Sequence, residues 1–175
     1  FLLVLNIQMI LLQILNKHWL HKIKIVTFFF IFYISGVSLL HSEVIKPSVN
    51  IEPNQVIKIQ LDGLMKNDDP SKDIGIIQTW EFAHPNNRRF TGPLEKFKEM
   101  IKGESYNILI NHKDHEIYEI YKDNNLAIFE VYILGRDKRY FKFKWQVEKY
   151  LNEGPLKNCW LTTIVSQPEP ITDTA

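Results

Sequence analysis

The spacing of the apolar residues changes at Gly103, and this change limits the fold more than any other feature of the sequence. Before Gly103, residues such as Ile57, Leu61 and Leu64 recur at intervals of three and four, which is typical of a helix with one buried face. After it, the apolar residues of 141–148 alternate with polar ones, which is typical of a half-buried strand. Helices followed by strands predict an α+β domain whose helices cover one face of an antiparallel sheet.

Three helices are predicted in the first part of this domain. Glu52 and Pro53 suit the start of the first helix, because an acid and a proline are both favourable in a first turn. Residues 91–93 are expected to open the third helix, with Thr91 as its cap, and Gly103 is expected to end it. The predicted helices cover residues 55–66, 74–83 and 94–102, with Ile74, Ile77 and Trp80 on one face of the second, and a polar loop covers residues 84–90.

Consecutive hairpins are predicted in the second part of the domain. Polar residues, glycines and prolines at 123–125, 135–138 and 152–155 mark turns between apolar stretches. The predicted strands cover residues 116–121, 126–134, 141–148 and 158–165, after a short apolar segment at 106–110. Residues 166–175 contain Pro168 and Pro170 and are predicted to be a disordered tail.

Residues 1–42 have a different composition from the rest of the chain. They hold 27 of the 79 hydrophobic residues, three lysines and no acid. A basic stretch at 17–24 precedes an uncharged run at 25–40, and polar residues follow, which is the order of a secretory signal peptide. The run of 16 residues is just below the roughly 17–25 that a membrane-spanning helix needs. We therefore favour a cleaved signal and a periplasmic or secreted domain over a membrane anchor with an exported domain.

The remaining N-terminal residues complete the predicted organisation. Residues 1–16 are also apolar and are interpreted either as spurious or truncated translation or as the first half of a membrane hairpin. A hydrophobic helix within residues 1–42 is then followed by a linker at 43–52, an α+β domain at 53–165 and the tail.

The composition of the remaining chain argues against nucleic-acid binding, an intramolecular disulfide and a metal or cofactor site. The chain has 21 basic and 20 acidic residues, and without the three lysines of residues 1–42 its formal charge is −2. Such a domain lacks the basic surface that nucleic-acid binding requires, and membrane contact is expected only through residues 1–40. Cys159 is the single cysteine, so we expect a small buried hydrophobe there and no intramolecular disulfide. The sequence contains no phosphate loop and no metal-ligand spacing, and we expect neither a cofactor nor a metal.

Several separated motifs resemble those of an uncharacterised family. The motifs are QLDGL at 60–64, DDP at 68–70, FAHPNNR at 82–88, TGPLEKF at 91–97 and CWLT at 159–162. In this order they resemble a domain-of-unknown-function family of exported bacterial and plant proteins, with its QLDAL-like helix, FASPxNR-like loop and TGPLE helix start. The resemblance covers roughly residues 55–165. Gly63 stands where the family has alanine, and His84 stands where it has serine, which weakens any role assigned to that serine.

The order of elements is also similar to the nuclear-transport-factor-like, or cystatin-like, superfamily, in which helices pack on a strongly curved sheet around a cavity. This resemblance implies a cavity without implying its chemistry, because the superfamily includes isomerases, dehydratases, ligand carriers and interaction modules. The first helix and the concave sheet face line such a cavity. The lining residues that the resemblance implies are Asp62, Trp80, Tyr118, Tyr132, Trp145 and Trp160. As the favoured alternative, the aromatic residues are ordinary core. Asp62 lies one residue off the apolar stripe and faces either solvent or the cavity, where it would suit proton transfer.

The polar segment around residue 88 has two interpretations. In the first, the Arg88 guanidinium and the amides of the following helix, with Asn87, Thr91 and Gly92, bind a carboxylate or phosphate. In the second, which we prefer, Asn87 organises a turn, Thr91 caps the helix and Arg88 pairs with an acid such as Asp62 or Asp69. His84, His112 and His115 fit no nucleophile or metal-ligand pattern.

Two functional hypotheses from different classes follow. The first is a non-catalytic binding module for a small apolar ligand or a protein partner, with a homodimer as one arrangement. The second is a small cofactor-free isomerase, hydrolase or dehydratase that uses Asp62 with His84 or Arg88. The first hypothesis is favoured because it requires only the fold, whereas the second requires two titratable groups that converge inside the cavity.

Overall fold

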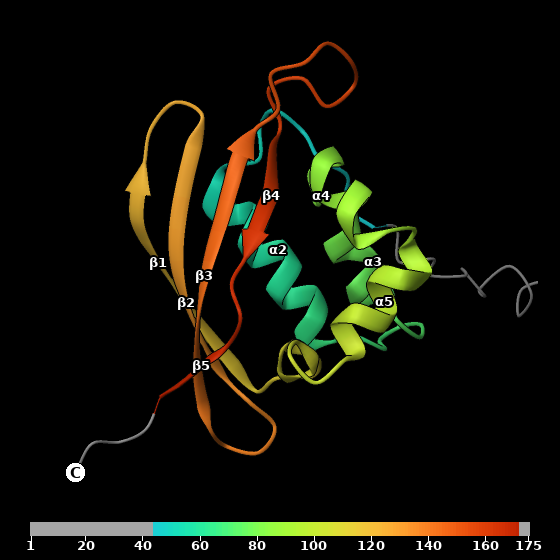
Figure 1. Ribbon diagram of the computed structural model, residues 1–175, viewed down its shortest axis with the longest axis vertical. Helices are drawn as coiled ribbons and strands as arrows, with labels where there is room; N and C mark the ends of the chain where they lie inside the picture. The colour runs from blue at the N-terminus through green and yellow to red at the C-terminus, as the bar shows by residue number, and fades with distance from the viewer. Residues whose placement is uncertain (1–43, 172–175) are drawn as a thin grey trace, which may run out of the picture. The chain divides into compact units, whose positions relative to one another are not determined.

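The computed structural model describes residues 44–171, which form an α+β domain, as the sequence predicts. Four α-helices come first and a five-stranded antiparallel sheet follows (Figure 1). The predicted signal or anchor at residues 1–42 lies outside the described residues. Within residues 44–171, no helix has the length and apolar character that crossing a membrane requires.

The helical half contains one more α-helix than the sequence predicts, and a 3-10 helix as well. Its elements are α2 (Pro53–Met65), α3 (Ile74–Glu81), α4 (Pro85–Thr91), α5 (Leu94–Lys102) and the 3-10 helix η1 (Asn107–Leu109). Helix α4 occupies the segment that was expected to be a polar loop, and η1 lies in the apolar segment at 106–110, where the strand-like pattern was expected to begin. Thr91 is the last residue of α4 and does not cap α5, whose N-cap residue is Pro93.

The sheet has the predicted order of consecutive hairpins. Its strands are β1 (Asp114–Lys122), β2 (Leu126–Leu134), β3 (Tyr140–Lys149), β4 (Trp160–Val165) and β5 (Glu169–Ile171), in the order β1-β2-β3-β4. Strand β5 pairs with the first residues of β3, and β4 pairs with its last residues. The tail predicted to be disordered from residue 166 onward therefore contains a short strand, because the edge of β3 beyond β4 is free to accept one.

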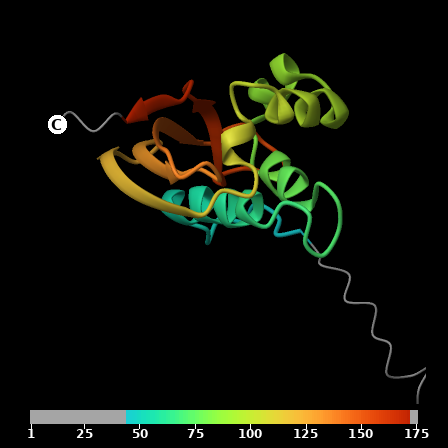
Figure 2. The same cartoon turned by 90° about the horizontal axis from the view of Figure 1, so that it is seen from below.

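Helix α2 is the helix on which the sheet packs. Gln55 accepts a hydrogen bond from the Glu52 backbone at 2.9 Å, which closes the N-terminal turn. The side chains of Val56, Ile57 and Leu64 are fully buried, as a stripe with this spacing predicts. Helix α2 contacts β1, β3 and β4, and the sheet curves around it (Figure 2). The alternating residues of β2 and β3 complete the core from the sheet side: Phe129, Val131, Ile133, Phe143, Trp145 and Val147.

Helix α3 packs against α2 through small residues. The predicted face of Ile74, Ile77 and Trp80 is only half-buried, and Gly75 and Ile76 are buried instead. A Cβ atom built on Gly75 would lie 2.1 Å from the Gly63 carbonyl oxygen, so the helices cross too closely for any side chain there. The contact distance between the helix backbones therefore decides which face of α3 is buried.

The two glycines at this crossing predict opposite effects of the same substitution. Gly75→Ala should reduce the free energy of unfolding by about 1–3 kcal/mol, because the added methyl group overpacks the crossing. Gly63→Ala should raise it by about 0.5–1 kcal/mol, because its Cβ would meet Gln78 at an ordinary 3.4 Å and alanine favours helix. Urea unfolding of both variants measures the difference. Equal effects of the two substitutions would contradict this account of the crossing.

Candidate functional site

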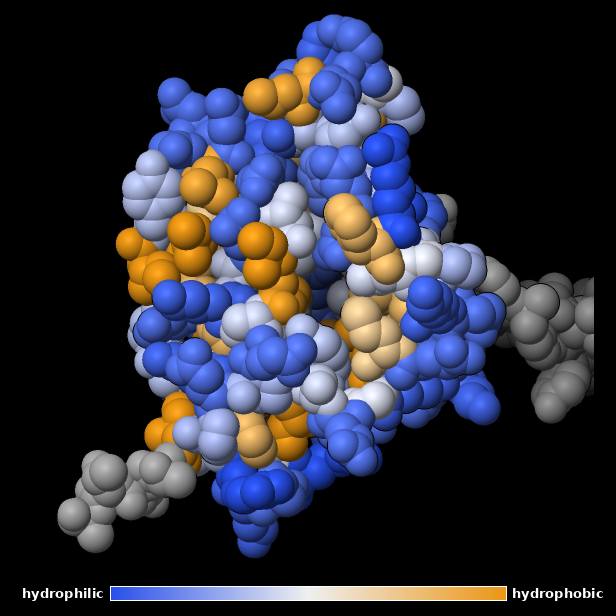
Figure 3. Space-filling view, viewed as in Figure 1, coloured by the Kyte–Doolittle hydropathy of each residue, from blue (hydrophilic) through white to orange (hydrophobic). Residues whose placement is uncertain are grey.

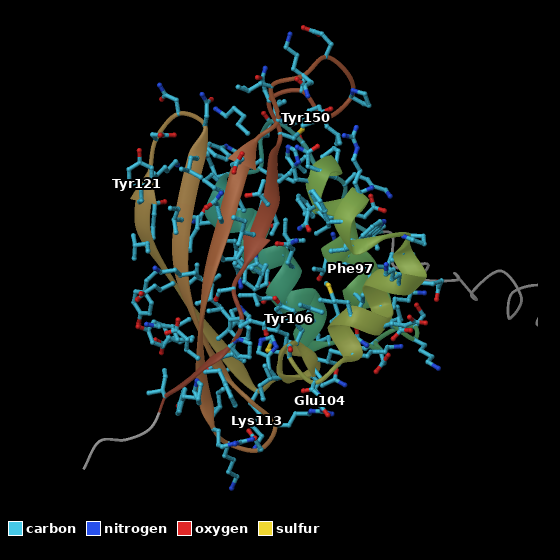
Figure 4. All side chains as sticks on the ribbon, viewed as in Figure 1. Phe97, Glu104, Tyr106, Lys113, Tyr121 and Tyr150 are labelled. Carbon is cyan, nitrogen blue, oxygen red and sulfur yellow. The ribbon has the colours of Figure 1, made fainter. Side chains whose placement is uncertain are left out.

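A cleft of about 210 Å³ lies between β4 and the helical half of the domain. The surface is hollowed between the strand side and the helix side (Figure 3), and two of its lining residues, Phe97 and Tyr106, lie on the helix side of the sheet (Figure 4). Most of the lining is apolar. The lining residues are Gln60, Leu64, Thr79, Ala83, Asn87, Thr91, Phe97, Met100, Ile101, Tyr106, Leu109, Trp145, Thr162, Thr163, Ile164 and Val165.

A chain of buried hydrogen bonds forms the floor of the cleft. The Trp145 Nε1 atom donates to the Thr162 hydroxyl at 3.3 Å, and this hydroxyl donates to the Gln60 Oε1 atom at 2.7 Å. The Gln60 Nε2 atom in turn donates to the Thr79 carbonyl oxygen at 3.0 Å. The chain joins α2, α3, β3 and β4, and no side-chain nitrogen or oxygen buried within the described residues is left without a partner.

Helix α4 is held beside the cleft by a short backbone bridge to β4. The Thr162 N–H donates to the Phe82 carbonyl oxygen at 2.8 Å, and the His84 N–H donates to the Thr162 carbonyl oxygen at 2.9 Å. His84 then begins α4, because its Nδ1 atom accepts a hydrogen bond from the Asn86 N–H at 3.1 Å. A histidine here performs the capping that a serine performs at many helix starts.

The lining contains one titratable side chain, Tyr106. Its hydroxyl group donates to the Val165 carbonyl oxygen at 3.2 Å and accepts from the Gln167 Nε2 atom at 3.3 Å. Burial raises the pKa of Tyr106 above its usual value, so the phenol stays neutral. The described lining therefore contains no side chain that is charged at neutral pH.

The structure brings only part of the predicted site together. Asn87, Thr91 and Trp145 line the cleft. The predicted residues that do not line it are Asp62, Trp80, Arg88, Gly92, Tyr118, Tyr132 and Trp160. The side chains of Trp80 and Trp160 are core or near-core: Trp80 packs on Phe97 with 4.9 Å between ring centroids, and Trp160 is buried beneath the Lys149 ammonium group.

Tyr118 and Tyr132 lie on the face of the sheet that the helices do not cover. Tyr118 is opposite Glu130 in the β1–β2 register, next to the buried Phe129, and its ring meets that of Tyr132 edge to face at 5.6 Å. Tyr118 is 51% exposed, and Tyr121, on the same strand, also lies away from the helices (Figure 4). The alternation of β2 already indicates this, because Tyr132 lies between two buried residues of the opposite face.

Asp62 is half-exposed and pairs with neighbours outside the cleft. Its carboxylate lies 3.1 Å from the Lys58 Nζ atom and 3.6 Å from the His115 Nε2 atom. Neither His84 nor Arg88, its predicted catalytic partners, is among these contacts. Asp62 therefore does not face the apolar lining of the cleft, where a catalytic carboxyl would have to lie.

Arg88 stabilises the end of α3. Its Nε atom donates to the Ala83 carbonyl oxygen at 3.0 Å, and its Nη2 atom donates to the carbonyl oxygens of Trp80 and Glu81 at 2.7 and 2.8 Å. The guanidinium also lies 5.1 Å from the centre of the Trp80 ring. The prediction that Arg88 pairs with an acid such as Asp62 or Asp69 is wrong, because its Nε and Nη2 atoms bond carbonyl oxygens at the end of α3 instead.

A pair of histidines connects η1 to β1 and α2. The His112 Nδ1 atom lies 2.7 Å from the Leu109 carbonyl oxygen, and its Nε2 atom lies 2.9 Å from the His115 Nδ1 atom. Since a carbonyl oxygen only accepts, neutral His112 donates from Nδ1, and His115 donates to its Nε2 atom. A proton on the His115 Nε2 atom faces Asp62 and leaves the hydrogen bond between the two rings intact. A proton on the His112 Nε2 atom removes this hydrogen bond, because Nε2 then no longer accepts.

Several cleft residues were missed in the sequence, and one of them carries a detectable signal. Gln60 is three residues from Ile57 and four from Leu64, so it is a polar residue on the apolar stripe of α2. Buried polar groups require partners, and this position therefore indicates a buried network. The contributions of Met100, Tyr106 and Leu109 carry no such signal, because only the tertiary packing brings them to β4.

The sequence predicts a buried cysteine at position 159 and no metal site. Cys159 is buried just before β4, and burial raises the pKa of its thiol. Among residues 44–171, no cluster of three or more histidine, cysteine, aspartate or glutamate side chains is arranged to hold a metal ion.

Comparison with protein-family models, curated proteins and solved structures finds no match to this chain. The resemblance to the exported family stays a prediction, and the geometry of the cleft carries the functional argument.

The role of Arg88 predicts a specific loss of stability. Arg88→Lys should lower the free energy of unfolding by about 2 kcal/mol, because all donors of an ammonium group lie on one nitrogen, whereas Arg88 reaches the three carbonyl oxygens from the Nε and Nη2 atoms of a rigid guanidinium. Arg89→Lys is the matched control, since Arg89 is exposed on the same helix, and should have little effect. Urea unfolding compares the two variants. Equal stabilities of the two variants would contradict the role assigned to Arg88.

The histidine pair predicts that stability decreases as the pH falls. Burial is the main cause that lowers the pKa of His112 and of His115, so the folded protein binds fewer protons than the unfolded chain, whose histidines titrate near pH 6.5. The contribution of the two histidines to the free energy of unfolding is complete above about pH 6.5. Below this pH the free energy of unfolding should decline, by up to about 1.4 kcal/mol per pH unit for each histidine.

Urea unfolding between pH 8 and pH 5 measures this slope. His112→Asn should flatten it even though the variant is less stable overall. His84→Ser is the comparison variant: burial also lowers the pKa of His84, and serine retains the cap, so this substitution should remove only the His84 contribution and leave that of the pair. An unchanged slope in His112→Asn would show that the pair does not carry the pH dependence.

Proposed function

We propose that this domain is a non-catalytic binding module that holds a small, largely apolar ligand in the cleft. The observation that carries the proposal is the chemistry of the lining: apolar side chains surround it, and its polar groups are uncharged at neutral pH. General acid–base catalysis requires a group that exchanges protons near the operating pH. The enzyme alternative based on Asp62 loses support, because this carboxylate pairs with Lys58 and His115 outside the cleft.

The size of the cleft limits the ligand. An apolar cavity of about 150 Å³ accepts benzene, so a volume of about 210 Å³ suits a molecule with one ring or a short branched chain. The apolar walls supply most of the binding energy, through surface removed from water. The satisfied floor of Gln60, Thr162 and Trp145 keeps the walls in place without a ligand.

We also propose a cystatin-like fold for this domain and an exported location. The helices on one side of a curved sheet, with a cleft between them, agree with a cystatin-like cone and with the exported family that the motifs resemble. The basic stretch and the apolar run of residues 17–40 support export, either through a cleaved signal or on a membrane anchor. A protein partner or a second copy remains an alternative for the sheet face that carries Tyr118 and Tyr132.

Binding of toluene tests the proposed function. Toluene should shift the NMR signals of the methyl groups of Leu64, Leu109 and Val165, which line the cleft. Met100→Trp should weaken this binding at least tenfold, because the larger side chain fills the cleft from α5. Glu99→Trp adds the same side chain at the neighbouring exposed position and should leave the affinity unchanged. Shifts confined to other parts of the domain, or equal affinities in the two variants, would exclude the cleft as a binding site.

A further inference from the structure

Asn87 differs from every other polar residue of the cleft. The side chains of Gln60, Thr162 and Trp145 bond one another in the floor, and Thr79 donates to the Gly75 carbonyl oxygen at 2.9 Å. The hydroxyl groups of Thr91, Thr163 and Tyr106 also have partners within the protein. Among the hydrogen bonds of the described residues, none involves the Asn87 carboxamide.

The position of Asn87 is fixed even though its carboxamide has no partner. It lies in the middle of α4, which the bridge between residues 82–84 and β4 holds beside the cleft. Thr91, one turn later, donates to the Asn87 carbonyl oxygen at 3.0 Å, which restrains the backbone at this position. Asn87 is half-buried and belongs to the cleft lining. A ligand in the cleft can therefore meet the carboxamide of a residue whose backbone position is restrained.

The charge of the ligand is limited by the same lining. An ion that leaves water for an apolar site needs an opposite charge or several hydrogen bonds. The nearest cation in sequence, Arg88, directs three of its donors to the end of α3 and does not line the cleft. An anion bound in the cleft would have no counter-charge there, whereas a neutral group would need only a hydrogen-bond partner.

We infer that the cleft selects an uncharged one-ring ligand with an amide-like head group, which the Asn87 carboxamide recognises. The inference rests on the proposed function and adds its ligand class. A carboxamide offers one acceptor oxygen and two donor hydrogens, so it pairs with a primary amide, a lactam or a ring imide through an N–H···O bond in each direction. The ring of such a ligand would lie against the apolar walls, which include Phe97, Leu109 and Val165.

Three probes of nearly equal size separate these contributions. Toluene has the ring alone, benzamide adds a neutral amide, and benzoate adds a charge. NMR titration of the folded domain should give benzamide at least tenfold higher affinity than benzoate and higher affinity than toluene. Asn87→Leu, which retains the approximate shape of the side chain, should reduce benzamide affinity at least tenfold and leave toluene within twofold. Asn86→Leu is the matched control, because Asn86 is exposed on the same helix, and should behave as the parent protein.

The outcomes distinguish this inference from the proposed function. If toluene binds the cleft but benzamide affinity is unchanged in Asn87→Leu, the inference is overturned and the proposed function stands. If benzoate binds as well as benzamide, the exclusion of charge is wrong. If none of the probes binds the parent protein, both the proposed function and the inference about Asn87 are wrong. Asn87→Asp covers the case in which Asn87→Leu does not fold, and it should reduce benzamide affinity by a similar factor because it removes both donor hydrogens.

Discussion

The hydrogen bond from Thr162 to Gln60, 102 positions away in the chain, is the interaction on which the rest of the domain depends. It joins the first described helix to the fourth strand, and both groups are almost completely buried. Removing either partner would leave a buried polar group without a hydrogen bond, which costs more than the bond itself contributes. Because Trp145 and the Thr79 backbone extend the same network, the positions of α2, α3, β3 and β4 are specified together.

The polar segment after α3 shows how residues used for structure also shape the cleft. Arg88 bonds the carbonyl oxygens at the end of α3, and His84 caps α4, so these two side chains hold a short helix beside β4. Once that helix is in place, Asn87 faces the cleft without a structural task of its own. The same segment thus contains polar side chains that bond the protein itself, those of Arg88 and His84, and one, that of Asn87, that bonds no described residue. Only their contacts in the structure distinguish the two kinds.

The sequence predicts the regular elements well and the short ones poorly. The predicted strand 126–134 coincides with β2, because its residues alternate between a buried and a solvent face and little else fits that pattern. Helix α4 has seven residues and none is buried, so it has no apolar stripe to detect, and its asparagines resemble a turn. Strand β5 contains Pro170 and forms only because the edge of β3 is available. The face of α3 was assigned wrongly, because the largest apolar side chains do not lie where the helix backbones approach most closely.

The candidate site shows the same division. Spacing and composition by themselves determine the α+β class, the stripe of α2, the alternation of β2 and β3, and the slightly acidic character of the domain, because these follow from local periodicity and from counting. Of the ten site residues predicted from the sequence and its resemblances, only Asn87, Thr91 and Trp145 line the cleft. Which polar side chains bond inside the protein and which one faces a cavity depends on contacts between residues far apart in the chain. Only the tertiary structure decided that Arg88 bonds the end of a helix, that Asp62 lies outside the cleft, and that Asn87 lines the cleft without a side-chain hydrogen bond among the described residues.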